Sequence, residues 1–182
     1  MEIKLERIED NDMVYIYEWF KDIEFLKFYD YMPPIPQSAD EVNKTFRDYK
    51  KNEESDVFAI KLFDSNQIIG IAGFDDIVKE NKVATFFIGI GNKDVRGRGY
   101  GKEALKLLLE YGFNKLGFHR IQLNVLEFNM AAISLYEKAG FKREGTYREF
   151  VLRDDKRYDL LLYGILKSEW KKRWEKDPEG SF

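Results

Sequence analysis

Two periods of hydrophobic and polar residues run along this chain, and they predict where strands and helices lie. Period-two alternation and short apolar runs predict strands over residues 3–8, 57–63, 68–74, 83–90, 121–125, 148–152 and 158–166. Apolar residues three and four positions apart predict helices near residues 13–20, 38–49, 104–113 and 130–139. Polar turn sequences at 64–66, 80–81 and 154–155 separate consecutive strands.

Capping and breaking residues define several of these ends. Ser38 and Glu41 have the spacing of a capping box, which predicts that a helix begins there. Three prolines at 33, 34 and 36 remove backbone donors, so we expect residues 28–36 to be non-helical. Gly140 ends the last predicted helix, because glycine accepts a left-handed backbone conformation at no steric cost.

The order of these elements predicts a mixed α/β (α+β) fold. The early strands are joined by short turns, as in an antiparallel meander. A helix then separates the strand at 83–90 from the strand at 121–125, and such a crossover requires that these two strands be parallel. We therefore expect one domain over residues 1–182, with a mostly antiparallel sheet and a parallel pair near its centre.

The composition excludes several kinds of chemistry. The chain has no cysteine and a single histidine, His119, which rules out disulfides, thiolate metal sites and acyl-cysteine intermediates. Its 30 Lys and Arg against 33 Asp and Glu leave a net charge of −3, which gives no overall attraction to nucleic acid or anionic membranes. No apolar run is long enough for a membrane span, and the charged start is unlike a signal peptide. We expect a cytoplasmic protein without metal, nucleic-acid or membrane partners.

A glycine-rich turn, Arg96-Gly97-Arg98-Gly99-Tyr100-Gly101, follows an apolar strand and begins a helix. Glycines let backbone amides approach a ligand, and the amides of a helix N-terminus attract anions. A diphosphate fits such a site, with the two arginines as cationic donors. The turn lacks the third glycine of a dinucleotide-binding fingerprint and the Gly-Lys-Ser/Thr ending of a Walker loop. A surface turn that binds no ligand remains the alternative.

Two motifs in this order resemble those of the Gcn5-related N-acetyltransferase (GNAT) superfamily. The first is Arg96-x-x-Gly99-x-Gly101, and the second is the stretch from Asn129 to Phe141. The ending, from Arg157-Tyr158-Asp159-Leu160 to Glu169-Trp170, is similar to the ribosomal-protein-alanine and spermidine N-acetyltransferase branch. The resemblance covers about residues 4–170, and it implies helices on both faces of the sheet.

The resemblance also implies roles for individual residues. Main-chain groups of Gly89, Ile90 and Gly91 would hold pantetheine, and the amides of Arg96, Gly97, Arg98, Gly99, Tyr100 and Gly101 would hold the diphosphate. Asn129 would contact the cofactor, and Tyr136 would approach the thioester sulfur as the general acid. Without the motif around it, Tyr136 is also consistent with a core aromatic residue on a helix face.

The acceptor side is less defined by the sequence. The resemblance places Tyr29, Asp30 and Tyr31 in the wall of the acceptor groove, where rings around a carboxylate suit a cationic amine. A loop that simply packs on the sheet is the alternative. Candidates for the general base are Asp75, Asp76, Glu24 and Asp30, whereas His119 is interpreted as structural.

The function implied by the resemblance is transfer of an acetyl group from acetyl-CoA, as co-substrate, directly to a primary amine. The acceptor is a protein N-terminus, a polyamine or another small amine, and a homodimer remains open. A non-catalytic acyl-CoA-binding or sensory domain of the same fold is the first alternative, and an unrelated nucleotide-binding protein is the second.

Overall fold

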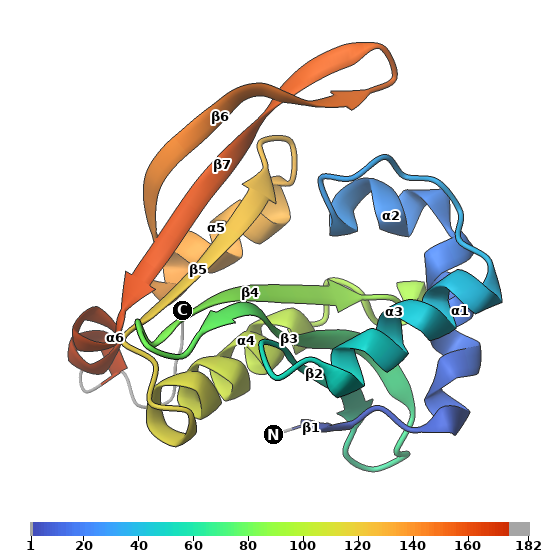
Figure 1. Ribbon diagram of the computed structural model, residues 1–182, viewed down its shortest axis with the longest axis horizontal. Helices are drawn as coiled ribbons and strands as arrows, with labels where there is room; N and C mark the ends of the chain where they lie inside the picture. Colours follow the sequence, from blue (N-terminus) through green and yellow to red (C-terminus); the bar gives the residue numbers. More distant parts are fainter. Residues whose placement is uncertain (1, 175–182) are drawn as a thin grey trace.

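The computed structural model describes residues 2–174, and its strands form one sheet of seven in the order β1-β2-β3-β4-β5-β7-β6 (Figure 1). The strands are β1 (Ile3–Arg7), β2 (Asp56–Leu62), β3 (Ile68–Val78), β4 (Val83–Ile90), β5 (Arg120–Leu126), β6 (Lys142–Arg153) and β7 (Lys156–Leu166). Every neighbouring pair is antiparallel except β4 with β5. The predicted fold class is therefore confirmed. The expectation of a single domain over 1–182 stays a prediction, since residue 1 and residues 175–182 lie outside the described residues.

Helices cover both faces of the sheet. They are α1 (Met13–Lys21), α2 (Ile23–Tyr29), α3 (Ala39–Lys51), α4 (Tyr100–Glu110), α5 (Met130–Ala139) and α6 (Lys167–Trp174), with short turns η1 (Asp10–Asp12), η2 (Lys93–Val95) and η3 (Tyr111–Lys115). Alternation along β2 separates two cores: Val57 and Ala59 pack with α1, α2 and α3, whereas Phe58 and Ile60 pack with α4 and α5.

The two parallel strands stay together only briefly. Val83, Ala84 and Thr85 of β4 pair with Arg120, Ile121 and Gln122 of β5, and the register ends there. Beyond that point β4 remains paired with β3 and β5 with β7, so the sheet opens between them. Figure 1 shows β4 and β5 diverging, with α2 at the open end.

Two local expectations were wrong or incomplete. Phe28 and Tyr29 were expected to be non-helical, but they end α2. The backbone donors before Pro33 are intact, so the prolines do not prevent a helix over these two residues, and α2 ends where Asp30 becomes extended, with φ −138° and ψ 160°. β6 begins at Lys142 and is therefore longer than the predicted strand at 148–152. The prediction missed its first half because this part is an exposed edge strand, and its polar residues show no period-two pattern.

Candidate active site

The opening between β4 and β5 contains a cleft of about 580 Å³. Residues 85–90 of β4 and 124–126 of β5 line its two edges. α2 and α3 contribute residues from one face of the sheet, and α5 and the start of α4 contribute residues from the other. The cleft therefore passes through the sheet, and its walls come from segments that are far apart in the sequence.

At one end of the cleft, the glycine turn leads into α4. Gly99 is the N-terminal cap of α4 with a φ of 93°, a left-handed conformation that favours glycine. A Cβ added at Gly97 or Gly99 would meet no atom within 4 Å, and one at Gly101 would meet only Leu135, at 3.9 Å. Open space thus lies over the turn, beside the amides of a helix N-terminus, where an anionic ligand is stabilised.

The side chain of Arg96 lines the cleft and also bonds to the protein backbone. Its Nε donates to the carbonyl of Ile90 at 2.9 Å, and its Nη2 donates to the carbonyl of Gly91 at 3.1 Å. The guanidinium therefore ties the turn to the end of β4 with two of its five N–H donors. Arg98 is exposed, and Tyr100 is half-buried against the core.

The glycines at the end of β4 are needed for packing. A Cβ at Gly89 would lie 2.7 Å from the ring of Tyr29, and one at Gly91 would overlap the ring of Trp19. Both contacts are on the face that carries α1 and α2. Only a residue without a side chain lets these rings lie against the strand.

α5 presents two of the expected residues. Asn129 caps the helix, because its Oδ1 accepts from the amide of Ala132 at 3.2 Å, and its Nδ2 donates to the carbonyl of Phe28 at 3.4 Å. Tyr136 lines the cleft with its ring 7% exposed, packed edge-on to Phe86. Burial raises the pKa of the Tyr136 hydroxyl above its usual value, so it is protonated at neutral pH.

Aromatic rings form the wall on the other face of the sheet. Tyr29 stacks on Phe25 with ring centroids 4.9 Å apart, and Tyr49 stacks on Phe87 at 6.2 Å. Tyr29 meets Phe87 edge-on at 6.5 Å, which joins the two pairs. Tyr49 was missed by the sequence analysis, because nothing in its helix distinguishes it from an ordinary core residue.

Four carboxylates line this part of the cleft, and they differ in their surroundings. Glu24 is exposed and pairs with Lys93 at 3.0 Å, and Asp76 is exposed. Asp30 is exposed and accepts from the amide of Met32. Asp75 is half-buried, its Oδ2 accepts from the Tyr49 hydroxyl at 3.3 Å, and burial raises the pKa of its carboxyl.

Most of the expected site residues meet in one place. Those that line the cleft are Tyr29, Asp30, Tyr31, Gly89, Ile90, Arg96, Gly101, Asn129 and Tyr136. Those outside its lining are Gly91, Gly97, Arg98, Gly99 and Tyr100. His119 is exposed, and its backbone bonds to Lys82 and Lys167.

Residues 2–174 contain neither a cluster of metal ligands nor a membrane-spanning helix. No group of three His, Cys, Asp or Glu side chains there is arranged to hold a metal ion. No helix in that range is long and apolar enough to cross a membrane.

Relatives named as N-acetyltransferases match much or nearly all of the chain. YnaD of Bacillus subtilis (strain 168), named an uncharacterized N-acetyltransferase, is 28% identical over 169 residues, which are 91% of this chain and 94% of that protein. The spermidine N(1)-acetyltransferase of Vibrio cholerae is 25% identical over 174 residues, 96% of this chain and 98% of that protein. The ribosomal-protein-uS5-alanine N-acetyltransferase of Escherichia coli is 29% identical over 122 residues, 65% of this chain and 62% of that protein.

A solved structure shares the fold. It is the spermidine N-acetyltransferase from Vibrio cholerae in complex with CoA and spermine, with a TM-score of 0.86 at 24% identity, covering 93% of this chain and 98% of that one. The family described as the acetyltransferase (GNAT) domain matches residues 2–142. With its divided sheet and its N-acetyltransferase relatives, this chain belongs to the GNAT family and is an N-acetyltransferase.

Proposed function

We propose that this enzyme transfers the acetyl group of acetyl-CoA to a primary amine, in one step and with both substrates bound. The observation that carries the proposal is the cleft through the sheet, which has the glycine turn at one end and a buried tyrosine beside it. Such a passage lets a thioester enter from one face and an amine from the other. The attacking nitrogen and the carbonyl carbon then meet at the gap between β4 and β5.

The donor is proposed to occupy the face that carries α4 and α5. Its diphosphate would lie over the amides that begin α4, in the open space above Gly99 and Gly101. Its pantetheine would run along β4 past Thr85, where that edge of the strand no longer pairs with β5. The solved structure that shares this fold is a complex with CoA, which supports acetyl-CoA as the donor.

The acceptor is proposed to enter from the face that carries α2 and α3. Aromatic rings and carboxylates are the groups that hold a cationic amine, and both line this wall. The names of two relatives specify amine acceptors, spermidine in one and the alanine of a ribosomal protein in the other. We therefore propose a small polyamine or a protein N-terminus as the acceptor class.

Asp75 is the proposed base. It pairs across the sheet with Thr85, which is the last residue of β4 that pairs with β5. Residues opposite one another in an antiparallel pair project from the same face, so Asp75 lies one strand away from the point where the sheet opens. Of the four carboxylates that line the cleft, it is the one whose pKa burial raises, toward the range of a useful base.

The proton steps balance as follows. The ammonium gives one proton to Asp75, directly or through water, and the free nitrogen bonds to the thioester carbon. The carbon–sulfur bond then breaks. Tyr136 delivers its hydroxyl proton to the departing sulfur. As the amide forms, the nitrogen releases its second proton, and this proton restores the Tyr136 hydroxyl.

The test of the proposal is Tyr136→Phe, assayed with acetyl-CoA and either spermidine or an alanine-ended peptide. Removal of the hydroxyl should lower kcat by about 10² to 10⁴ and leave CoA binding, followed by thermal shift, nearly unchanged. Tyr163→Phe is the matched control, because it also removes a tyrosine hydroxyl from the same core. The Tyr163 hydroxyl donates to Glu137 at 2.8 Å, and Tyr163 does not line the cleft.

Full activity in Tyr136→Phe would reduce Tyr136 to a packing residue. If the unaltered protein binds CoA but acetylates neither amine nor peptide, the non-catalytic acyl-CoA-binding alternative is favoured. If it is stabilised by ADP or NAD as strongly as by CoA, the donor assignment is wrong.

A further inference from the structure

Three charged side chains are buried within the described residues: Asp12, Lys61 and Arg153. Lys61 and Asp12 lie 3.1 Å apart and neutralise one another. Arg153, which is 4% exposed, makes no ion pair with any residue of 2–174, and burial lowers the pKa of its guanidinium. The carboxylates of Asp30 and Asp154 favour the charged form but form no ion pair with it, so the groups that bond to Arg153 have to compensate for the loss of water.

Arg153 is held by backbone carbonyls of a distant segment. Its Nη2 donates to the carbonyl of Asp30 at 2.9 Å and to that of Met32 at 2.7 Å, and its Nη1 donates to the carbonyl of Leu152 at 2.9 Å. Residues 28–32, which we call the acceptor wall, contain Tyr29, Asp30 and Tyr31 of the cleft lining. Arg153 itself is absent from that lining.

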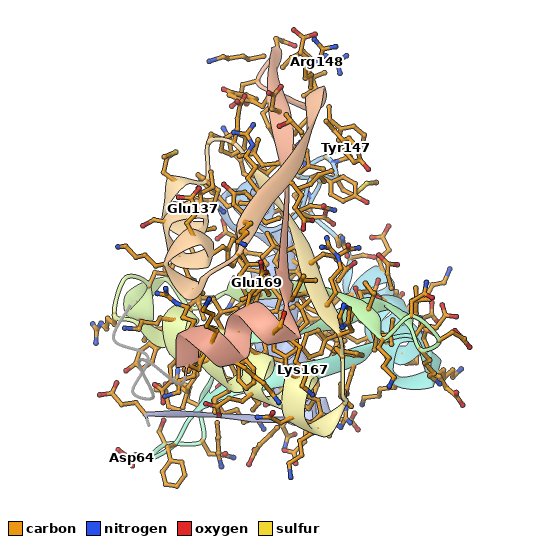
Figure 2. The ribbon with its side chains drawn as sticks, turned by 90° about the vertical axis from the view of Figure 1, so that its left-hand side faces the viewer. Asp64, Glu137, Tyr147, Arg148, Lys167 and Glu169 are labelled. Carbon is orange, nitrogen blue, oxygen red and sulfur yellow. The ribbon has the colours of Figure 1, made fainter. Side chains whose placement is uncertain are left out.

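The location of Arg153 explains how it reaches the wall. It ends β6, directly before a turn whose residues Asp154 and Asp155 have positive φ angles. The hairpin of β6 and β7 extends beyond the sheet on the side of α2 in Figure 1, and Figure 2 shows Tyr147 and Arg148 toward its far end. Phe150 contacts the ring of Tyr31 at 5.7 Å, and Asp154 pairs with Lys27.

The fork shape of guanidinium matters here. One Arg153 nitrogen bridges two carbonyls of the wall while another holds its own strand, which fixes both segments relative to one another. A lysine carries a single nitrogen and cannot reproduce this planar arrangement. These hydrogen bonds therefore set the position of residues 30–32. They also set the positions of the Asp30 carboxylate and of the rings of Tyr29 and Tyr31 on either side of it.

We propose that Arg153 is a positioning residue for the acceptor: it clasps the acceptor wall to the β6–β7 hairpin and so sets acceptor affinity without touching either substrate. This role rests on the proposed function, since it assigns the wall to the amine. The donor side of the cleft is built by other elements, the glycine turn and α5. Loss of the clasp should thus separate the two Michaelis constants.

The test is Arg153→Lys, which keeps the charge and most of the side chain. With spermidine, or the alanine-ended peptide if that is the amine acetylated, the acceptor KM should rise about tenfold or more. The KM for acetyl-CoA should change by less than about twofold. Backbone amide exchange in residues 28–32 should become about tenfold faster, while exchange in α4 and α5 stays as in the unaltered protein.

Asp154→Asn is the matched control. It removes the exposed ion pair to Lys27, which joins the same hairpin to α2 one residue before the acceptor wall, and asparagine tolerates the positive φ of this position. Both Michaelis constants and the exchange of residues 28–32 should stay within about twofold of the unaltered protein, as exposed pairs contribute little.

Three outcomes would overturn the proposal. The first is an acceptor KM in Arg153→Lys equal to that of the unaltered protein, and the second is an equal rise in both Michaelis constants with faster exchange throughout. The third is unchanged exchange in residues 28–32. Amide exchange can be measured without enzymatic activity, so it tests the role of Arg153 even if neither amine is acetylated. Absence of acetylation by the unaltered protein would instead contradict the proposed function.

Discussion

Five glycines lie between residues 89 and 101, and they divide into two groups with opposite surroundings. At the end of β4, Gly89 and Gly91 lie directly beneath the rings of Tyr29 and Trp19, with no room for a side chain. In the turn before α4, Gly97 and Gly99 face open space, and Gly101 has one atom at 3.9 Å.

The difference separates two reasons for glycine that look identical in a sequence. The strand glycines accommodate neighbours that the protein itself supplies, so their replacement should affect folding. The turn glycines leave a space that no other described residue fills, so their replacement should affect a ligand. Three substitutions test this division, in order of expected size.

Gly91→Ala should have the largest effect. The new Cβ overlaps Trp19, which is itself buried among α1 and β2, so the ring has to shift within a packed core. Overpacking of this kind costs about 1–3 kcal/mol of unfolding free energy. Chemical denaturation measures it, with CoA affinity of the folded protein expected to stay unchanged. A stability equal to that of the unaltered protein would show that the ring moves freely and that the division is wrong at this position.

Gly99→Val should act mainly on the ligand. A valine side chain would project into the space proposed for the diphosphate, and CoA affinity should fall about tenfold or more, equivalent to about 1.4 kcal/mol. The left-handed conformation also disfavours valine, so folding is checked by circular dichroism. Unchanged CoA binding by the folded variant would remove the turn from the binding site.

Gly101→Ala should have the smallest effect, and it is free of strain. Gly101 lies in the first turn of α4 without a positive φ, and alanine stabilises a helix relative to glycine by about 0.5–1 kcal/mol. We expect a slightly higher melting temperature together with a measurable loss of CoA affinity in calorimetry. Ser134→Ala, on the exposed side of α5, controls for the gain in helix propensity. Greater stability with unaltered affinity would mean that no ligand lies over this residue.

Short-range features of the chain were predictable from its sequence. The glycine turn, the Asn129 cap and Gly140 at the end of α5 follow from backbone preferences of single residues, and all three occur where they were expected. The parallel pair followed from the helix that separates its two strands, and it is confirmed. Family motifs added Tyr136, which lines the cleft, and its role as the general acid stays a prediction.

Other features could not be predicted in this way. The bonds from the Arg96 guanidinium to the carbonyls of Ile90 and Gly91 are one example, because nothing in the motif indicates them. The prolines led us to expect residues 28–36 to be non-helical, although the backbone donors before Pro33 are intact and α2 includes Phe28 and Tyr29. Tyr49 looked like any other aromatic residue of an amphipathic helix.

Local backbone chemistry therefore determined the elements and the glycine turn, because a cap, a positive φ or an apolar period involves residues only a few positions apart. The tertiary structure alone decided the contacts that hold the wall of the cleft on the side of α2 and α3. Tyr49 reaches Asp75 across 26 positions, and Arg153 reaches the carbonyls of Asp30 and Met32 across 123 and 121. The first contact forms only when α3 packs on β3, and the second only when the β6–β7 hairpin lies beside α2. No local pattern encodes either geometry.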